Sequence, residues 1–153
     1  MKRIISLLFV IVCILSLCAC SLSKEPISSD DFTVYFEGKD YYVEDITSQY
    51  DNEVFNAVII AMSTKNDYQI EFYDLTSDAY AKNLFSNNKS SIDEELQGNT
   101  MANSAEMGNV SKYSKNNSSV YGIISRVGDT VVYSEGPAEN MEDVKTVLKD
   151  LGF

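Results

Sequence analysis

The sequence contains no histidine and no tryptophan among its 153 residues. Without histidine, the chain cannot form a Ser-His-Asp or Cys-His catalytic arrangement, and it lacks the neutral imidazole that commonly acts as a general base. An S-x-x-K pattern at Ser86–Lys89 is typical of serine acyl-transferases that act on cell walls, but Lys145-Thr146 is followed by Val147 and not by the glycine of their K-T-G motif. We therefore expect a non-enzymatic protein with no catalytic residue and no cofactor.

Cysteine is also scarce, and all three cysteines, Cys13, Cys18 and Cys20, lie within the first 20 residues. Cys18 and Cys20 are too close in sequence for an unstrained disulfide. A metal site would need further ligands, and histidine is absent. We expect no structural disulfide beyond residue 20 and no metal site.

Positively charged residues are also few. The chain has 23 acidic residues and only 12 lysines and arginines, which gives a formal net charge of −11. Loss of Lys2 and Arg3 with an N-terminal leader would change −11 to −13. Such a surface repels phosphate backbones, so we expect no nucleic-acid partner. It is also repelled by anionic lipid headgroups. We expect Arg126, the only arginine after Arg3, to occupy an exposed strand position; the alternative is that it grips a carboxylate.

The N-terminus does contain one long apolar run, from Ile4 to Leu17, preceded by Lys2 and Arg3. Fourteen helical residues reach about 21 Å, less than the ~30 Å hydrocarbon core of a bilayer. A positive start, a short apolar stretch and small residues at its end indicate a secretory signal peptide.

The end of this run, Leu17-Cys18-Ala19-Cys20, resembles the lipobox of bacterial lipoproteins. In that family the last cysteine receives a diacylglyceryl group on its sulfur, and a peptidase then cuts before it. The resemblance implies a signal peptide at 1–19, lipidated Cys20 with a short tether at 20–27, and a single domain at 28–153. It also implies a position at the outer face of the cytoplasmic membrane. An uncleaved N-terminal anchor is the alternative, and it gives nearly the same location.

The segment 29–38 allows two interpretations. Ser28 or Ser29 followed by Asp30 and Asp31, with Gly38 at the end, is typical of a short capped helix. The alternation of apolar residues at 32, 34 and 36 favours a hairpin strand instead. We favour the helix, and both interpretations place a strand at about 41–47.

Further along, periodicity predicts strands within 56–75 and 110–135 and helices at 76–92 and 138–151. In the last helix Met141, Val144, Val147, Leu148 and Leu151 share one face. Gly128-Asp129 suits a type II′ hairpin turn. The segment 93–109 shows neither period and predicts a long exposed loop.

These elements indicate an α+β fold: an antiparallel sheet of two β-meanders, with helices packed on one face and the C-terminal helix closing the fold. The two halves both read strand, strand, helix. This order leaves open whether they arose by internal duplication or are two independent meanders, each closed by a helix.

The segments Tyr68–Tyr73, Ser125–Tyr133 and Leu151–Phe153 make residues 56–153 similar to small lipoproteins of low-GC Gram-positive bacteria, a family with no assigned chemistry. Seven tyrosines on expected strands either form an uncovered binding face or lie at core edges; they are Tyr41, Tyr42, Tyr68, Tyr73, Tyr113, Tyr121 and Tyr133. We expect a membrane-anchored binding module whose protein or small-molecule partner is undefined. The alternative is a structural or accessory subunit of a cell-envelope complex.

Overall fold

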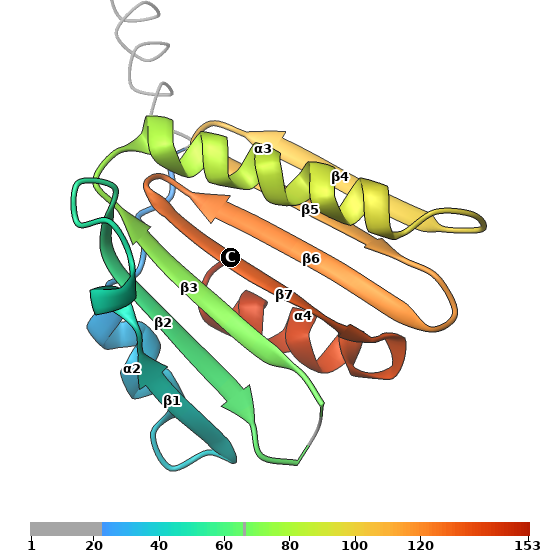
Figure 1. Cartoon of the computed structure of the whole chain (residues 1–153), viewed down its shortest axis with the longest axis horizontal. Coiled ribbons are helices and arrows are strands. Elements are labelled where there is room, and N and C mark those ends of the chain that lie inside the picture. The colour runs from blue at the N-terminus through green and yellow to red at the C-terminus, as the bar shows by residue number, and fades with distance from the viewer. Residues whose placement is uncertain (1–22, 66) are drawn as a thin grey trace, which may run out of the picture.

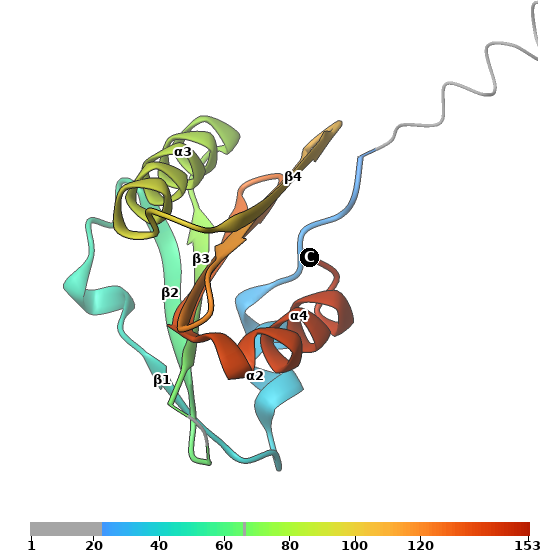
Figure 2. The same cartoon turned by 90° about the vertical axis from the view of Figure 1, so that its right-hand side faces the viewer.

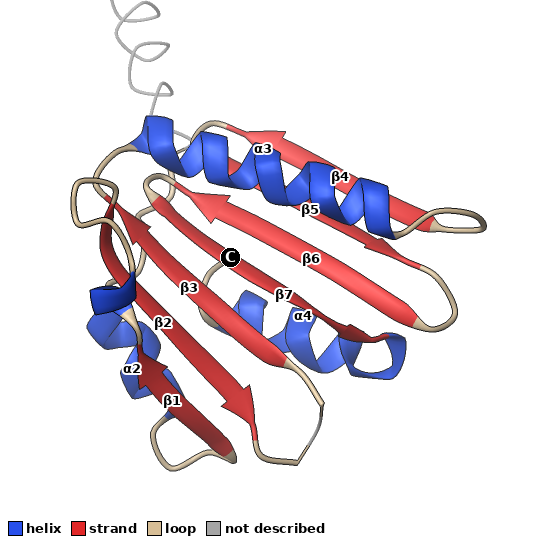
Figure 3. Cartoon of the chain, in the orientation of Figure 1, coloured by secondary structure: helices blue, strands red, loops and turns tan. Residues whose placement is uncertain are grey.

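The computed structural model describes residues 23–65 and 67–153. In this part of the chain seven strands form one antiparallel sheet in the order β1-β2-β3-β7-β6-β5-β4, flanked by three α-helices (Figures 1 and 3). The strands are β1 (Tyr41–Asp45), β2 (Phe55–Ser63), β3 (Gln69–Leu75), β4 (Met101–Met107), β5 (Val110–Asn116), β6 (Val120–Val127) and β7 (Thr130–Pro137). The helices are α2 (Ser29–Phe36), α3 (Asp78–Glu95) and α4 (Met141–Asp150), with short 3₁₀ turns η1 (Thr47–Gln49) and η2 (Ala138–Asn140).

The sheet consists of two meanders, β1-β2-β3 and β4-β5-β6-β7, which join where β3 pairs with β7. Phe72 of β3 lies opposite Val132 of β7 at this junction, and neither side chain is exposed. The chain then ends in α4, and the five residues expected to share its buried face are all buried, four within the helix and Leu151 directly after it. The α+β class, the two meanders and the closing C-terminal helix are therefore confirmed.

The helices do not all pack on one face, which corrects a detail of the expectation. Figure 2 shows α2 and α4 on one side of the sheet and α3 on the other. Neighbouring residues of β2 divide between two cores, with Val58 in the core under α3 and Ile59 in the core under α2 and α4. A strand with apolar residues in succession, as in Ala57-Val58-Ile59, requires cover on both faces.

This placement also bears on the likeness of the two halves. The antiparallel strands β3 and β7 meet at the centre, so a twofold axis that relates the two halves would be perpendicular to the sheet. Rotation about such an axis does not exchange the faces of the sheet, so both closing helices would lie on the same face. Instead α3 and α4 cover opposite faces (Figure 2). The arrangement is that of two meanders without internal twofold symmetry.

The segment at 29–38 is helical, as favoured. The Ser28 hydroxyl accepts a hydrogen bond from the Asp31 backbone N–H at 3.0 Å, which caps the first turn of α2. Gly38 follows the helix with a φ of 72°, a conformation that glycine adopts without a Cβ clash. Phe32 and Phe36 point into the core, and Phe32 stacks on Phe72 of β3.

The expectation of a long exposed loop at 93–109 is wrong. Helix α3 continues to Glu95, and β4 occupies Met101–Met107 as an edge strand whose seven residues are all exposed. Gly108-Asn109 turns β4 into β5, with Gly108 at a φ of 60°. The periodicity of the sequence does not indicate this strand, because an edge strand that is open on both faces needs no apolar alternation.

Candidate functional site

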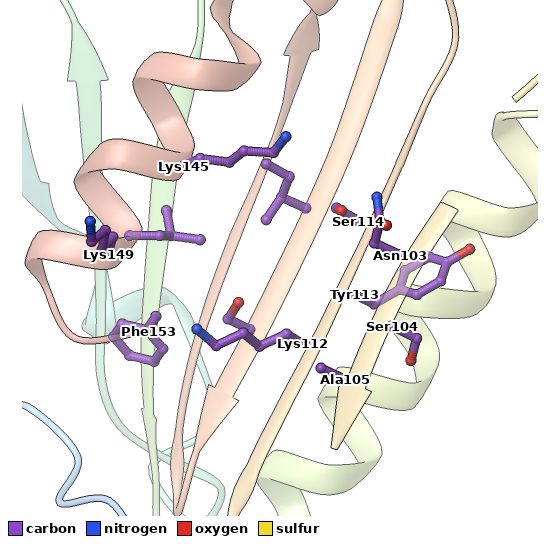
Figure 4. A pocket seen from close by; sticks show the side chains of 12 residues that line it. Asn103, Ser104, Ala105, Lys112, Tyr113, Ser114, Lys145, Lys149 and Phe153 are labelled. Carbon is purple, nitrogen blue, oxygen red and sulfur yellow. The ribbon is translucent and has the colours of Figure 1, made fainter. Parts of the chain in front are cut away.

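An open groove with a volume of about 400 Å³ lies on the α4 side of the sheet, between α4 on one side and β5 and the edge strand β4 on the other (Figure 4). Its apolar floor comes from Ile123 of β6, Leu148 of α4 and the C-terminal residue Phe153. All three residues are buried, each at most 4 % exposed, so the floor is a fixed part of the core. Asn103 and Ala105 of β4 form the far wall.

Three lysines line this groove: Lys112 from β5, and Lys145 and Lys149 from α4. In Figure 4 the Lys112 side chain runs from the strand toward Phe153. Lys145 is paired with Glu142 of its own helix, at 2.7 Å between Nζ and Oε1. Within residues 23–65 and 67–153, Lys112 and Lys149 form no ion pair. A chain of net charge −11 therefore carries a local positive site above an apolar floor.

A fourth lysine adds to this positive charge. The Lys24 side chain lies beside Gly152, at the C-terminal end of the groove. Partial burial lowers the pKa of the Lys112 ammonium below its usual value, and the charge of Lys24 lowers this pKa further. An anion placed between these ammonium groups would relieve their mutual repulsion.

The N-terminal segment is attached to the domain next to this groove. The Lys24 backbone N–H donates to Asn109 Oδ1 at 2.9 Å, and Asn109 Nδ2 donates back to the Lys24 carbonyl at 2.8 Å. Ile27 then packs against the core. Part of the expected tether therefore lies on the domain, and position 20 is four residues before Lys24, a reach of at most about 14 Å.

The expected anchor site lies outside the described residues. It consists of Cys20 with the lipobox residues Leu17, Cys18 and Ala19. No helix in the described part of the chain is long and apolar enough to cross a membrane.

The seven tyrosines do not form one binding face. Tyr68 and Tyr121 belong to the core under α4, whereas Tyr73 and Tyr113 belong to the core under α3. Of the seven, only Tyr42 is classed as exposed, at 57 %. Burial and a hydrogen bond between Tyr113 and Asp93 raise the pKa of the Tyr113 hydroxyl to about 12. Apart from Tyr42, these side chains are core edges with bonded hydroxyls, the simpler of the two interpretations.

Arg126 is buried, at 3 % exposure, which contradicts the expectation of an exposed strand position. Its guanidinium contacts the carboxylate of Asp78 in the first turn of α3, the Gly128 carbonyl at 2.8 Å and the Ser111 hydroxyl at 3.3 Å. Its Nε is buried without a hydrogen-bond partner in the described part of the chain. The ion pair joins residues 48 positions apart and ties the start of α3 to β6, so Arg126 is a structural cation.

Asp93, part of an acidic run at 93–95, is the centre of a polar network on the α3 side. Its carboxylate accepts hydrogen bonds from Lys89 at 2.7 Å, from Tyr113 at 2.5 Å and from Lys115 at 3.0 Å. The bonds from Lys89, then Tyr113 and Lys115, hold the pKa of this carboxyl well below its usual range. Lys89 is therefore engaged with Asp93, and its S-x-x-K partner Ser86 is one turn away on exposed helix surface.

Comparisons of the chain with protein-family models, with curated proteins and with solved structures found no match. In the part of the chain that the structure describes, no three Cys, Asp or Glu side chains are arranged to hold a metal ion. The groove beside α4 combines a concave apolar floor with three lining lysines, so it is the candidate binding site. Sequence reasoning missed it because Lys112 and Lys149 are 37 residues apart and have no motif in common.

Proposed function

We propose that this protein is a lipid-anchored, extracytoplasmic binding module without enzymatic activity, and that the groove beside α4 takes an anionic ligand with an apolar portion. The observation that carries the proposal is the set of lysines around an apolar floor, two of them without a carboxylate partner among the described residues. An anionic head would sit between Lys112 and Lys149. An apolar body would cover Ile123, Leu148 and Phe153.

The energetics favour a ligand with both parts. Exposed charge pairs contribute only about 0–1 kcal/mol each, so the lysines alone give weak attraction. Burial of apolar surface contributes roughly 25 cal/mol per Å², so the apolar portion of the ligand, removed from water in the groove, is the larger source of affinity. The lysines then select the sign of the ligand charge and speed its approach.

The anchor rests on the resemblance of Leu17-Cys18-Ala19-Cys20 to a lipobox. Lipid on Cys20 would hold the domain close to the bilayer, because only three residues lie between Cys20 and the attached Lys24. The net charge of the chain is repelled by anionic headgroups, so the acyl chains would provide the attachment. The groove would then face the region just outside the membrane surface.

The anchor is tested by Cys20→Ala. Cells that express the full chain are labelled with a fatty acid, and the protein is recovered for autoradiography and mass spectrometry. We expect label and cleavage before Cys20 in the unchanged chain and neither in the variant. Equal labelling of the two chains would refute the lipid anchor.

The groove is tested with dodecyl phosphate and dodecanoate below their micelle concentrations, with monomeric dodecyl maltoside as the neutral probe. We expect titration calorimetry to detect the two anions and no comparable binding of the maltoside. The combined variant Lys112→Gln/Lys149→Gln should weaken anion binding about tenfold, from two exposed charge pairs. Lys82→Gln on α3, on the opposite face, is the matched control and should leave binding unchanged.

Equal binding of charged and neutral probes would refute the role of the lysines, and absence of binding by all three would refute the groove as a ligand site. The accessory-subunit alternative is favoured by a different observation, the exposed edge of β4. An edge strand of this kind offers backbone groups to another chain.

A further inference from the structure

The free edge of β4 has little of what usually protects a sheet edge. Its sequence, MANSAEM, has no lysine and no proline, and Glu106 is its only charged residue. The pairing of β4 with β5 runs through seven residues without a register shift, so no bulge twists the edge away. Natural edge strands are typically short, charged, bulged or covered, and a long neutral edge is a template for strand addition.

The outward backbone groups of β4 follow from the ladder. The Gly128 N–H donates to the Asn109 carbonyl at 2.9 Å, so the backbone of Asn109 faces β6 and, by alternation, that of Val110 faces β4. Val110 pairs with Met107 across the two-residue turn, so odd-numbered residues of β4 bond to β5. The N–H and C=O groups of Ala102, Ser104 and Glu106 therefore point away from the sheet.

We infer that this edge pairs with the same edge of a second copy of the chain, antiparallel and centred on Ser104. In this register Ser104 lies opposite Ser104 of the other copy, Ala102 opposite Glu106, Asn103 opposite Ala105, and Met101 opposite Met107. All seven residues find a partner, and no charge faces a like charge. The three residues with outward backbone groups are the ones that this register joins by hydrogen bonds.

The apolar ends of the strand support this pairing. Met101 is 68 % exposed and Met107 is 59 % exposed, and Met101 is the most exposed large apolar side chain of the described residues. Both occupy the α4 face of the strand, since they lie opposite Asn116 and Val110 in the ladder, on the face to which Val110 packs. Pairing about Ser104 would bring each methionine beside the other methionine of the second copy and shield both from water.

The direction of the chain ends is compatible with this symmetry. A twofold axis through the Ser104 pair stands perpendicular to the sheet, so both copies keep α4 on the same side of the joined sheet. The N-terminal segment runs along that side, where Lys24 is hydrogen-bonded to Asn109 and lies beside Gly152 (Figure 2). Two chains anchored in one bilayer would therefore both meet it from one face. This last step rests on the lipid anchor proposed above, whereas the pairing itself does not.

A pair of seven-residue strands is a small interface, and each copy carries a net charge of −11. The association is therefore weak in dilute solution and is promoted when a membrane confines the copies to one surface. The joined sheet would also place the two lysine-lined grooves on the same face, on either side of the new strand pair.

The pairing is tested by disulfide trapping in membranes of cells that express the full chain. Opposite residues of a hydrogen-bonded antiparallel pair have Cα atoms about 5.5 Å apart, within the range of a disulfide. With copper-phenanthroline as oxidant, Ser104→Cys should give a covalent dimer of twice the chain mass. Ala102→Cys alone should give none, because its partner is Glu106. Co-expressed Ala102→Cys and Glu106→Cys chains with different tags should give a mixed dimer.

The unsubstituted chain reports any background from the three native cysteines, and Ser90→Cys on the exposed surface of α3 reports random collisions. Trapping of Ser90→Cys or Ala102→Cys as efficient as that of Ser104→Cys would overturn the register. Adducts of Ser104→Cys with other proteins only would assign the edge to a different partner and overturn the self-pairing. Because the fatty-acid label is scored separately, loss of the anchor and loss of the pairing are distinguishable.

A charge exchange at one position provides the second test, by analytical ultracentrifugation of the full chain in detergent. In the dimer, Ala102→Lys would place a lysine opposite Glu106 in two symmetry-related pairs and should tighten the association. Ala102→Glu would place two like charges opposite each other in both pairs and should weaken it. Two cross-strand pairs predict about a tenfold difference in dissociation constant. Within one copy Ala102 lies opposite Lys115, so the two variants should change monomer stability in the opposite sense. Equal dissociation constants for the two variants would overturn the proposal.

Discussion

β1 and β4 are the two edge strands of one sheet, and they are built differently. β1 has five residues, of which Glu44 and Asp45 are acidic, and α2 packs beside it through Phe36 and Tyr41. β4 has seven residues with one charge and is exposed along its whole length. The first edge is protected, and the second is available. The end of the sheet at β1 and α2 acts as scaffold, while the end at β4 and β5 holds both candidate interaction surfaces.

The largest expected effect separates the buried scaffold from the exposed end. Phe72 of β3 is fully buried and stacks on Phe32, at 4.8 Å between ring centroids. Phe72→Ala should lower the free energy of unfolding by about 3–5 kcal/mol, because it leaves a cavity in the core. Met101→Ala on β4 is the matched control and should change it by less than about 0.5 kcal/mol. Urea unfolding of residues 20–153 measures both, and similar losses would contradict the division into scaffold and open end.

A smaller effect is expected where α3 approaches the sheet most closely. A Cβ on Gly122 of β6 would lie 2.8 Å from Cγ1 of the buried Ile92. Gly122→Ala should therefore cost about 1–3 kcal/mol through overpacking. Ile92→Ala removes the clashing atoms, so the double variant should lose less than the sum of the two single variants. Additive losses in thermal or urea unfolding would show that α3 can move away from β6 freely.

The smallest effect concerns the Asp93 network beside β5. The folded-state pKa of the Asp93 carboxyl is lowered, so its stabilising contribution is full above the unfolded pKa near 4 and is lost as the pH falls through the folded value. Asp93→Asn should cost less than about 1 kcal/mol at pH 7, since the carboxylate is partly exposed. The difference from the unchanged chain should shrink below about pH 4. A difference that stays constant from pH 7 to pH 3 would contradict the assignment.

The elements that the sequence predicted well carry local signals. Ser28 and Gly38 mark the ends of α2, Gly128-Asp129 forms the expected turn with Gly128 at a φ of 59°, and the apolar face of α4 follows its spacing. The packing of helices on both faces of the sheet also has a local signal, the consecutive apolar residues of β2. The expectation of helices on one face does not take this signal into account. The turn at Gly108-Asn109 has the same chemistry as Gly128-Asp129 and is the signal that would have indicated β4.

The features that were missed depend on distant partners. Arg126 is buried because Asp78, 48 residues away, neutralises it, and no local pattern reveals that pair. The groove depends on how α4 lies against the sheet, which brings Lys112 and Lys149 to the lining of one groove only in the folded chain. β4 itself is held by its pairing with β5 and not by a buried face, so its composition resembles that of a loop.

Hydrogen exchange at the two edges tests the central claim, that β4 is the edge that pairs with a second copy of the chain and β1 is not. The full chain in native membranes is compared with the same chain diluted in detergent, and exchange is followed by mass spectrometry with fragmentation. We predict that the outward amides of Ala102, Ser104 and Glu106 exchange at least about tenfold more slowly in the membrane sample, while those of β1 are unchanged. Equal exchange of the β4 amides in the two samples, or new protection at β1 alone, would contradict the account.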